Sequence, residues 1–219
     1  MNTNCRIVNT ISLHFVVLLN TEIRVFSMKY FLSLVFILSF SIYTNAQFIT
    51  NVYWTDRTAM DTNDAIYYDL NKKLVWKDFK GTPGGAGPVA AITSSGFGYK
   101  ADMKTNGTKG QINIGVYCFF SKGKSWVKPG RTTPYILNHE QHHFNVSYLA
   151  ALFFIDKVKK TVITPANSNN VLPALYREAC DLMNKMQSDY DGQTKNGQVV
   201  EMQEKWNNFF AERLQPVTK

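Results

Sequence analysis

The segment 139–143 (HEQHH) contains two histidines four residues apart, with a glutamate directly after the first. On an α-helix, side chains at positions i and i+4 share one face, so His139 and His143 can bind one metal ion. Glu140 lies beside that face, where its carboxylate can act as a base on a metal-activated water. His142 points about 100° away around the helix and is excluded from the pair. The pattern predicts a zinc site with hydrolytic chemistry.

A carboxylate must supply the third protein ligand, because the chain after residue 46 has histidines only at 139, 142 and 143. Zinc hydrolases with two histidines complete the site in this way. Asp156 is excluded, since thirteen helical residues beyond His143 correspond to about 20 Å. We predict Asp191 as the third ligand, because the adjacent Gly192 gives the backbone freedom to aim it inward. Glu178 is the alternative.

Two further features would complete a hydrolase of this kind. Tyr190 is a candidate for stabilising the oxyanion, and buried packing is its other possible role. The strand-like segment 111–120 (QINIGVYCFF) is a candidate edge to which an extended substrate adds as a further strand.

Three helices are expected around the metal motif. Thr133 as N-cap and Pro134 at the first helical position predict a helix that runs to about residue 160 and contains the motif. Apolar residues at helical spacing predict a second helix over about 171–190, which Asp191-Gly192 would end. A third helix is expected over about 199–214.

Short strands precede these helices. Segments 66–70 and 74–76 are strand-like, and 89–103 and 111–120 are longer candidates for an antiparallel pair. The order of elements predicts an α+β fold in which a small antiparallel sheet packs on about three helices, a zincin-like arrangement with the H-E-x-x-H motif on the first long helix.

The beginning of the chain has the pattern of a targeting segment. Lys29, an apolar run over 31–43 and the small residues before Gln47 predict a secretory signal peptide over 28–46. Residues 1–27 are interpreted as the product of an upstream start, with an N-terminal membrane segment as the alternative. We therefore expect a single domain over 47–219 that is secreted or periplasmic, with no stable membrane anchor after cleavage.

The net charge limits the classes of binding partner, and the cysteine content limits the possible disulfides. The net charge is +8, and its small clusters at 72–73 and 157–160 suit a solubilising surface or, alternatively, affinity for anionic envelope polymers. No basic-aromatic repeat or phosphate-binding loop is present, so nucleic acid is not expected as a partner. Cys118 and Cys180 would remain after cleavage, either as a disulfide or as two buried thiols.

Several motifs together resemble one bacterial family. They are residues 76–81 (WKDFKG), 125–127 (SWV) and 138–144 (NHEQHHF), followed by 190–194 (YDGQT) and 203–206 (QEKW). The segment 65–215 is similar to an uncharacterised family of secreted zinc-dependent proteases (domain of unknown function 922). The resemblance implies a zinc peptidase-like fold. Two positions depart from the family pattern: Asn145 replaces an aspartate and Asn196 replaces a histidine, which would weaken zinc binding if that histidine is the family's third ligand.

The expected function is that of a secreted zinc metallopeptidase, with Zn²⁺ as cofactor and a peptide or protein of the cell envelope as substrate. In this hypothesis Glu140 promotes the attack of water on the peptide bond. Two alternatives remain open from the sequence. One is a non-catalytic envelope binding protein on a degenerate peptidase fold, and the other is a zinc amidase that acts on the cell wall.

Overall fold

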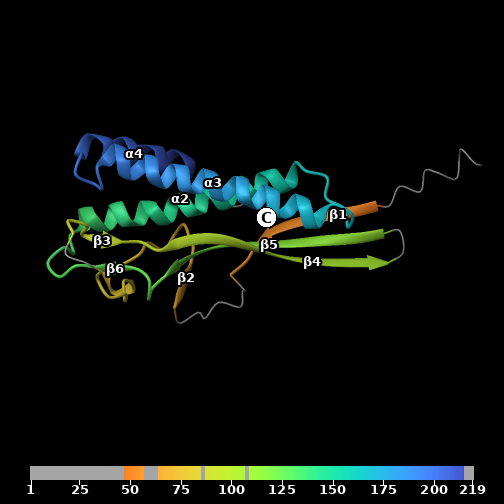
Figure 1. The fold of residues 1–219 in the computed structure, drawn as a ribbon, viewed down its shortest axis with the longest axis horizontal. Coiled ribbons are helices and arrows are strands. Elements are labelled where there is room, and N and C mark those ends of the chain that lie inside the picture. Colours follow the sequence, from red (N-terminus) through yellow and green to blue (C-terminus); the bar gives the residue numbers. More distant parts are fainter. Residues whose placement is uncertain (1–46, 57–63, 85–86, 107–108, 215–219) are drawn as a thin grey trace, which may run out of the picture. The chain divides into compact units, whose positions relative to one another are not determined.

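The computed structural model describes residues 47–56, 64–84, 87–106 and 109–214, which belong to one compact unit, Gln47–Lys219. The predicted upstream segment 1–27 and signal peptide 28–46 lie outside the described residues. Among the helices of the described part, none combines the length and the apolar character that a membrane span requires. The unit has an α+β architecture with three α-helices and a small mixed sheet (Figure 1).

Strand β5 (Lys109–Ser121) is the centre of the main sheet. Strand β4 (Ser95–Asn106) pairs with one of its edges in antiparallel register, from Ser95 opposite Phe120 to Asn106 opposite Lys109. Strands β1 (Gln47–Trp54) and β2 (Ala65–Tyr67) pair with the other edge. Because β1 runs parallel to β5, the prediction of a purely antiparallel sheet is wrong.

The central position of β5 also corrects the prediction that segment 111–120 offers a free edge to substrate. Both of its edges are occupied by other strands of the same chain. Its alternation buries one set of side chains in the core: Ile112, Ile114, Val116, Cys118 and Phe120. Strand β5 therefore contributes side chains to the hydrophobic core and has no free edge for a substrate.

Helix α2 (Pro134–Lys159) packs on the sheet, and α3 (Ser168–Thr194) and α4 (Val200–Arg213) pack on α2 (Figure 1). The predicted start of α2 is confirmed, because the side chain of Thr133 accepts a hydrogen bond from the backbone N–H of Ile136 at 3.2 Å. The predicted end of α3 is wrong, since the helix continues through Gly192. It ends where Lys195 adopts a left-handed conformation, with φ 48°.

Two of the predicted strands differ from the structure. Residues 74–76 form no strand, because a short 3-10 helix η1 (Trp76–Asp78) begins there and the Asp78 carboxylate accepts from the N–H of Val75. The segment 89–103 is divided into β3 (Ala91–Ile92) and β4. Strand β3 leaves the main sheet and pairs with β6 (Trp126–Val127).

The two cysteines are not joined. Cys118 is fully buried in the sheet core and Cys180 is partly exposed on α3, and both are free. Burial raises the pKa of the Cys118 thiol well above its usual value, so this thiol stays protonated in the folded protein. The two therefore act as packing residues, as in the thiol alternative of the sequence analysis.

Candidate metal centre

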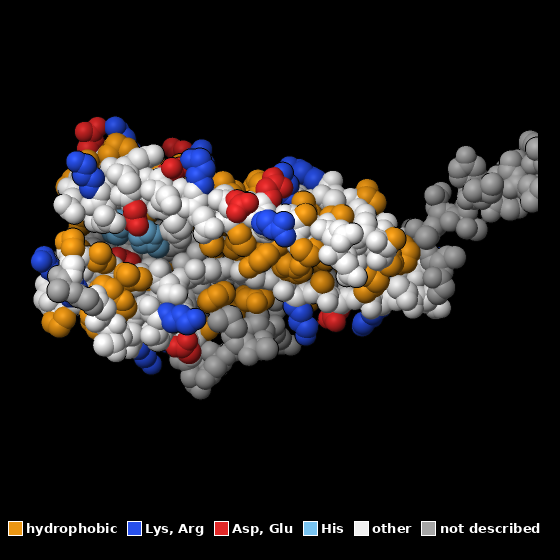
Figure 2. All heavy atoms as spheres, in the orientation of Figure 1, with side chains coloured by type: hydrophobic (Ala, Val, Ile, Leu, Met, Phe, Trp, Pro, Cys, Tyr) orange, Lys and Arg blue, Asp and Glu red, His pale blue; other side chains and the backbone are white. Residues whose placement is uncertain are grey.

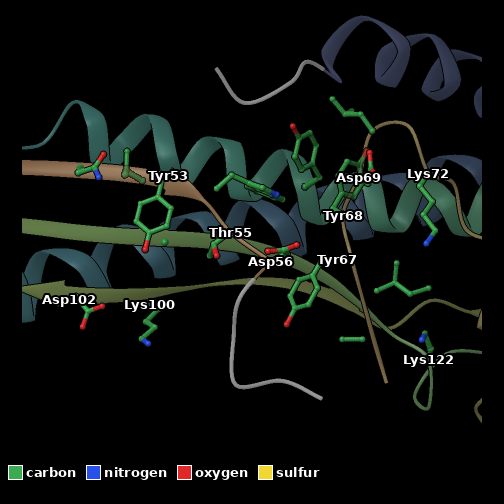
Figure 3. A pocket seen from close by; sticks show the side chains of 18 residues that line it. Tyr53, Thr55, Asp56, Tyr67, Tyr68, Asp69, Lys72, Lys100, Asp102 and Lys122 are labelled. Carbon is green, nitrogen blue, oxygen red and sulfur yellow. The ribbon is translucent and has the colours of Figure 1, made fainter. Parts of the chain in front are cut away.

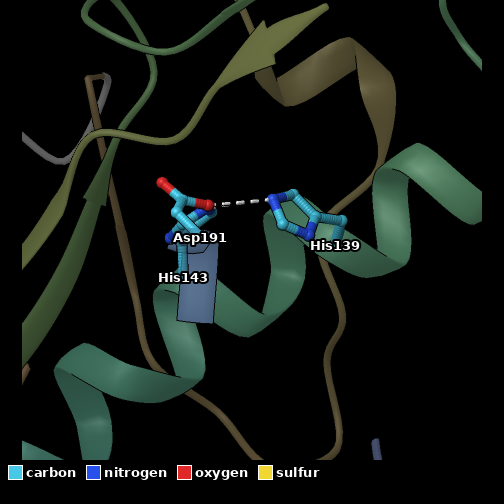
Figure 4. A group of neighbouring side chains, drawn as sticks. All are labelled: His139, His143 and Asp191. Carbon is cyan, nitrogen blue, oxygen red and sulfur yellow. Dashed lines mark hydrogen bonds and ion pairs between the residues drawn. The ribbon is translucent and has the colours of Figure 1, made fainter. Parts of the chain in front are cut away.

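The side chains of His139, His143 and Asp191 meet at one point between α2 and the last turn of α3 (Figure 4). The Oδ1 atom of Asp191 lies 3.2 Å from Nε2 of His139 and 3.2 Å from Nε2 of His143. The two Nε2 atoms are 3.3 Å apart. Three potential ligand atoms thus form a nearly equilateral triangle, and the group could hold a metal ion.

The size of this triangle suits a small tetrahedral ion. With bonds of about 2.0–2.1 Å to nitrogen and oxygen, a tetrahedral site separates its ligand atoms by about 3.3–3.4 Å. An octahedral site with bonds of about 2.0–2.1 Å would bring neighbouring ligands to about 2.8–3.0 Å. The observed separations of 3.2–3.3 Å are nearer to the tetrahedral value.

The two histidines and the aspartate are positioned by different parts of the fold. The motif 139–143 begins in the second turn of α2, where the four-residue spacing places His139 and His143 on one face. Asp191 reaches them because α3 packs along α2 and stays helical past residue 190. The freedom of Gly192 is therefore not what aims Asp191, since Gly192 is itself helical.

A glutamine supports each of the two histidines, and neither glutamine was found from the sequence. Oε1 of Gln203 on α4 lies 3.0 Å from Nδ1 of His139, and Oε1 of Gln187 on α3 lies 2.5 Å from Nδ1 of His143. Each amide oxygen accepts a hydrogen bond from Nδ1–H, which leaves the two Nε2 lone pairs facing Asp191. The sequence signal is weak: each glutamine interrupts an apolar helix face, Gln187 four residues after Met183 and Gln203 three before Trp206.

One oxygen of the Glu140 carboxylate, beside this group, has no hydrogen-bond partner among the described residues. Glu140 is buried, and its Oε2 atom has no hydrogen bond to any residue that the structure describes. Oδ1 of Asp191 is also buried, and it accepts no hydrogen bond while the two Nε2 atoms 3.2 Å away carry no proton. Buried carboxylate oxygens without donors are costly, and a bound cation would relieve that cost. The two unpartnered atoms and the donor set fit a divalent metal ion.

The electrostatics favour a positive charge at the centre. Burial by itself raises the pKa of Asp191, but its interactions with His139 and His143 outweigh this and hold the pKa well below its usual range. Burial by itself lowers the pKa of His143, whereas Asp191, Glu140 and Gln187 together raise it above its usual value. The site thus binds a proton on His143 readily, and a metal ion would compete for the same place.

A cavity of about 890 Å³ gives access to the group. Segment 88–95, which includes β3, forms one wall, and residues of α3 and the loop after it form the other. Figure 2 shows histidine surface at the bottom of this hollow, with acidic atoms on both sides of it. The hollow leaves room for a bound molecule beside the three ligand atoms.

A larger cavity of about 1310 Å³ lies elsewhere, between β1 and β2 (Figure 3). Its charged side chains include both lysines and aspartates, among them Lys100, Asp102 and Lys122. No histidine lines this cavity. The three converging ligand atoms lie in the smaller cavity, which makes it the candidate metal centre.

The structure does not support two predicted roles. Glu178 forms a surface ion pair with Lys157 at 2.5 Å and does not reach the histidines, so it is not the third ligand. Tyr190 is fully buried, and its hydroxyl bonds with Gln203 and the backbone oxygen of His139. Its ring stacks on His139, and Tyr190 is not among the residues that line the cavity, which fits the packing role better than the oxyanion role.

His142 is excluded from the metal group, as predicted, but it is not a surface residue. Its ring is buried and stacks on Phe210 of α4, with ring centroids 4.4 Å apart. Burial lowers its pKa to about 4, so the ring is neutral at ordinary pH.

The loop between α3 and α4 closes over His139 at Gly197. This glycine has φ +78°, and a Cβ added to it would lie 3.3 Å from Nδ1 of His139. We expect Gly197→Ala to lower the free energy of unfolding by about 1–2 kcal/mol through backbone strain and to weaken zinc binding by displacing the His139 ring. Urea unfolding and a zinc titration measure the two effects.

Gly192→Ala is the matched control for that substitution. Gly192 lies in α3, and nothing lies within 4 Å of an added Cβ. An alanine there should leave zinc binding unchanged and raise stability by about 0.5–1 kcal/mol. Equal zinc affinity in Gly197→Ala and Gly192→Ala would contradict the close approach to His139.

Comparisons of the chain with family models, with curated proteins and with solved structures found no match. The function is therefore argued from the geometry of this site.

Proposed function

We propose that the protein is a zinc-dependent metallopeptidase. The observation that carries the proposal is the convergence of two imidazole nitrogens and one carboxylate oxygen, 3.2–3.3 Å apart, next to Glu140, whose Oε2 atom has no hydrogen bond among the described residues. His139, His143 and Asp191 would hold the ion. A zinc ion at this place lowers the pKa of a water molecule and polarises a carbonyl group.

Glu140 acts as the general base in this proposal. Its Oε2 atom accepts no hydrogen bond from the described residues, so the carboxylate is available to take a proton from the attacking water. The same carboxyl group then delivers that proton to the leaving amine. The backbone of α2 keeps Glu140 at a constant position relative to both histidines, because it directly follows His139 in the helix.

The edge of strand β3, and not that of β5, is the place where we propose that an extended substrate adds as a further strand. The backbone oxygen of Ala90 accepts from the N–H of Lys128 next to the pairing of Ala91 with Val127, so β6 occupies one edge of β3. Alternation then turns the N–H and C=O of Ala91 away from β6. Ala91 lines the cavity, and β3 pairs with β6 alone among the described strands. An extended peptide can add to this edge and present its carbonyl groups to the metal.

Thr93 connects this guide to the catalytic helix. Its hydroxyl donates to the backbone oxygen of Glu140 at 3.2 Å, which joins the end of β3 to α2 beside the base. A substrate aligned on β3 is thereby aligned with Glu140 as well. The proposed export and the resemblance to secreted zinc proteases agree with a peptide substrate in the cell envelope.

The test measures zinc and hydrolysis separately. We expect the purified protein to contain one zinc ion per chain by elemental analysis and to cleave members of a peptide library, with activity lost to a chelator and restored by zinc. Absence of stoichiometric zinc after incubation with the metal would overturn the proposal. Zinc without cleavage of any peptide would favour the binding protein, and cleavage of peptidoglycan fragments alone would favour the amidase.

A further inference from the structure

We infer that His142, although it binds no metal, sets the protonation of the ligand His139 through a buried relay of hydrogen bonds. A neutral imidazole carries one proton, on either Nδ1 or Nε2, and only the nitrogen without the proton can bind a metal. His139 can therefore serve as a ligand through Nε2 only if its proton is on Nδ1. The order of donors and acceptors along the relay determines which nitrogen of His139 carries the proton.

The relay begins at a backbone N–H group, which can donate a hydrogen bond but cannot accept one. The backbone N–H of Leu74, just before η1, can only donate, and it donates to Oε1 of Gln141 at 2.8 Å. The amide Nε2 of Gln141 then donates to Oδ1 of Asn145 at 3.0 Å. The Tyr68 hydroxyl donates to the same oxygen at 2.9 Å. With its oxygen thus occupied, Asn145 must turn its NH₂ group toward His142.

The second half of the relay passes from α2 to α4 and back. Nδ2 of Asn145 lies 2.8 Å from Nδ1 of His142, so this nitrogen must accept and the proton of His142 must be on Nε2. That N–H donates to Oδ1 of Asn207 at 2.8 Å. Because Asn207 presents an oxygen, Gln203 must turn its Nε2 toward it, at 3.1 Å. Oε1 of Gln203 then faces Nδ1 of His139, at 3.0 Å.

Every member therefore has one orientation, and the last step puts the His139 proton on Nδ1. The Nε2 lone pair is left toward Asp191 and His143, where a metal would bind. The key members of this relay are buried, with Asn145 exposed to 3%, His142 to 7% and Gln203 to 0%, so water does not compete for their hydrogen bonds.

His143 is set by a separate and shorter arrangement. Nε2 of Gln187 donates to the backbone oxygen of His143 at 2.9 Å, and that oxygen can only accept. Oε1 of Gln187 must then face Nδ1 of His143. Because this pair shares no residue with the relay through His142, His143 is an internal control for His139.

The inference rests on the proposed metal site, but its first test needs no metal. Nitrogen NMR of the histidine rings in the metal-free full chain, at alkaline pH where the rings are neutral, reports which nitrogen carries each proton. We expect the Nδ1–H form for His139 and His143 and the Nε2–H form for His142. The Nδ1–H form at His142, or the Nε2–H form at His139, would overturn the inference.

The second test breaks the relay at Asn207, a member that is only partly buried. Asn207→Leu removes one of the two acceptors at Nε2 of Gln203 and leaves the Tyr190 hydroxyl, which can either donate or accept and so fixes no orientation. We therefore expect His139 to become a mixture of both forms while His143 keeps its proton on Nδ1. Zinc affinity, measured with zinc alone, should fall about 10–100-fold. Asn207→Asp keeps an acceptor at the same place and should restore both the Nδ1–H form of His139 and the affinity.

The outcomes separate this inference from the proposed function. An unchanged His139 in Asn207→Leu would overturn the relay, and an equal change in His139 and His143 would show general loss of structure and also overturn it. If the wild-type protein has the expected proton positions but binds no zinc, the relay stands and the metallopeptidase proposal fails. If Asn207→Leu does not fold, the wild-type spectrum still decides.

Discussion

Glu140→Gln is expected to lower kcat for peptide hydrolysis by about 10²–10⁴-fold while one zinc ion stays bound per chain. The amide has the size of the carboxylate but cannot accept the proton of the attacking water. Zinc should remain because Glu140 does not belong to the group of converging ligand atoms. Steady-state hydrolysis of a peptide found in the library and elemental analysis of the same sample measure the two quantities.

Glu178→Gln is the matched control, since it makes the same chemical change at an exposed acid. Glu178 pairs with Lys157 on the surface, where an ion pair contributes little, and we expect kcat and zinc content to be unchanged. If Glu140→Gln kept more than about a tenth of the wild-type kcat, a loss far below that of a general base, Glu140 would not be the base.

Asp191→Ala is expected to abolish stoichiometric zinc binding. Two imidazoles alone would remain, and the substitution removes the only carboxylate among the three converging atoms. The loss of affinity should exceed the 10–100-fold change typical of residues that merely support a ligand. Titration with zinc in the presence of a competing chelator measures it, and hydrolysis should be lost in parallel.

Asp189→Ala provides the comparison for this second substitution. Asp189 lies two residues earlier on α3 and forms an exposed ion pair with Lys185, away from the histidines. Its replacement should leave zinc affinity and hydrolysis unchanged. Equal zinc affinity in the two alanine variants would show that Asp191 is not a ligand, and the metal would then need another third donor.

The features that could be predicted from the sequence depend on neighbouring residues. The Thr133 cap and Pro134 mark the start of α2, and the four-residue spacing of His139 and His143 places them on one face once that helix exists. Asp191 is one of few carboxylates that the sequence offers as a third ligand, and the structure brings it to the histidine pair. Gly192 does not aim its side chain, however, because α3 continues through that residue.

The features that could not be predicted depend on contacts between distant segments. The pairing of β1 with β5 joins Gln47 to Lys109 and turns β5 into a central strand, which its own alternation cannot indicate. The hydroxyl of Tyr190 is directed by Gln203 on another helix. Gln187 and Gln203 support the histidines from α3 and α4, and a lone glutamine on an apolar face does not reveal its partner.

The candidate ligands come from two helices that are far apart along the chain, with His143 on α2 and Asp191 at the end of α3. An ion bound to both would act as a crosslink that closes a loop of about 48 residues. In the chain-entropy treatment of crosslinks, a loop of this length restricts the unfolded chain by about 4 kcal/mol. The metal would thus hold the helical hairpin together as a disulfide does in many exported proteins, in a chain whose two described cysteines remain apart.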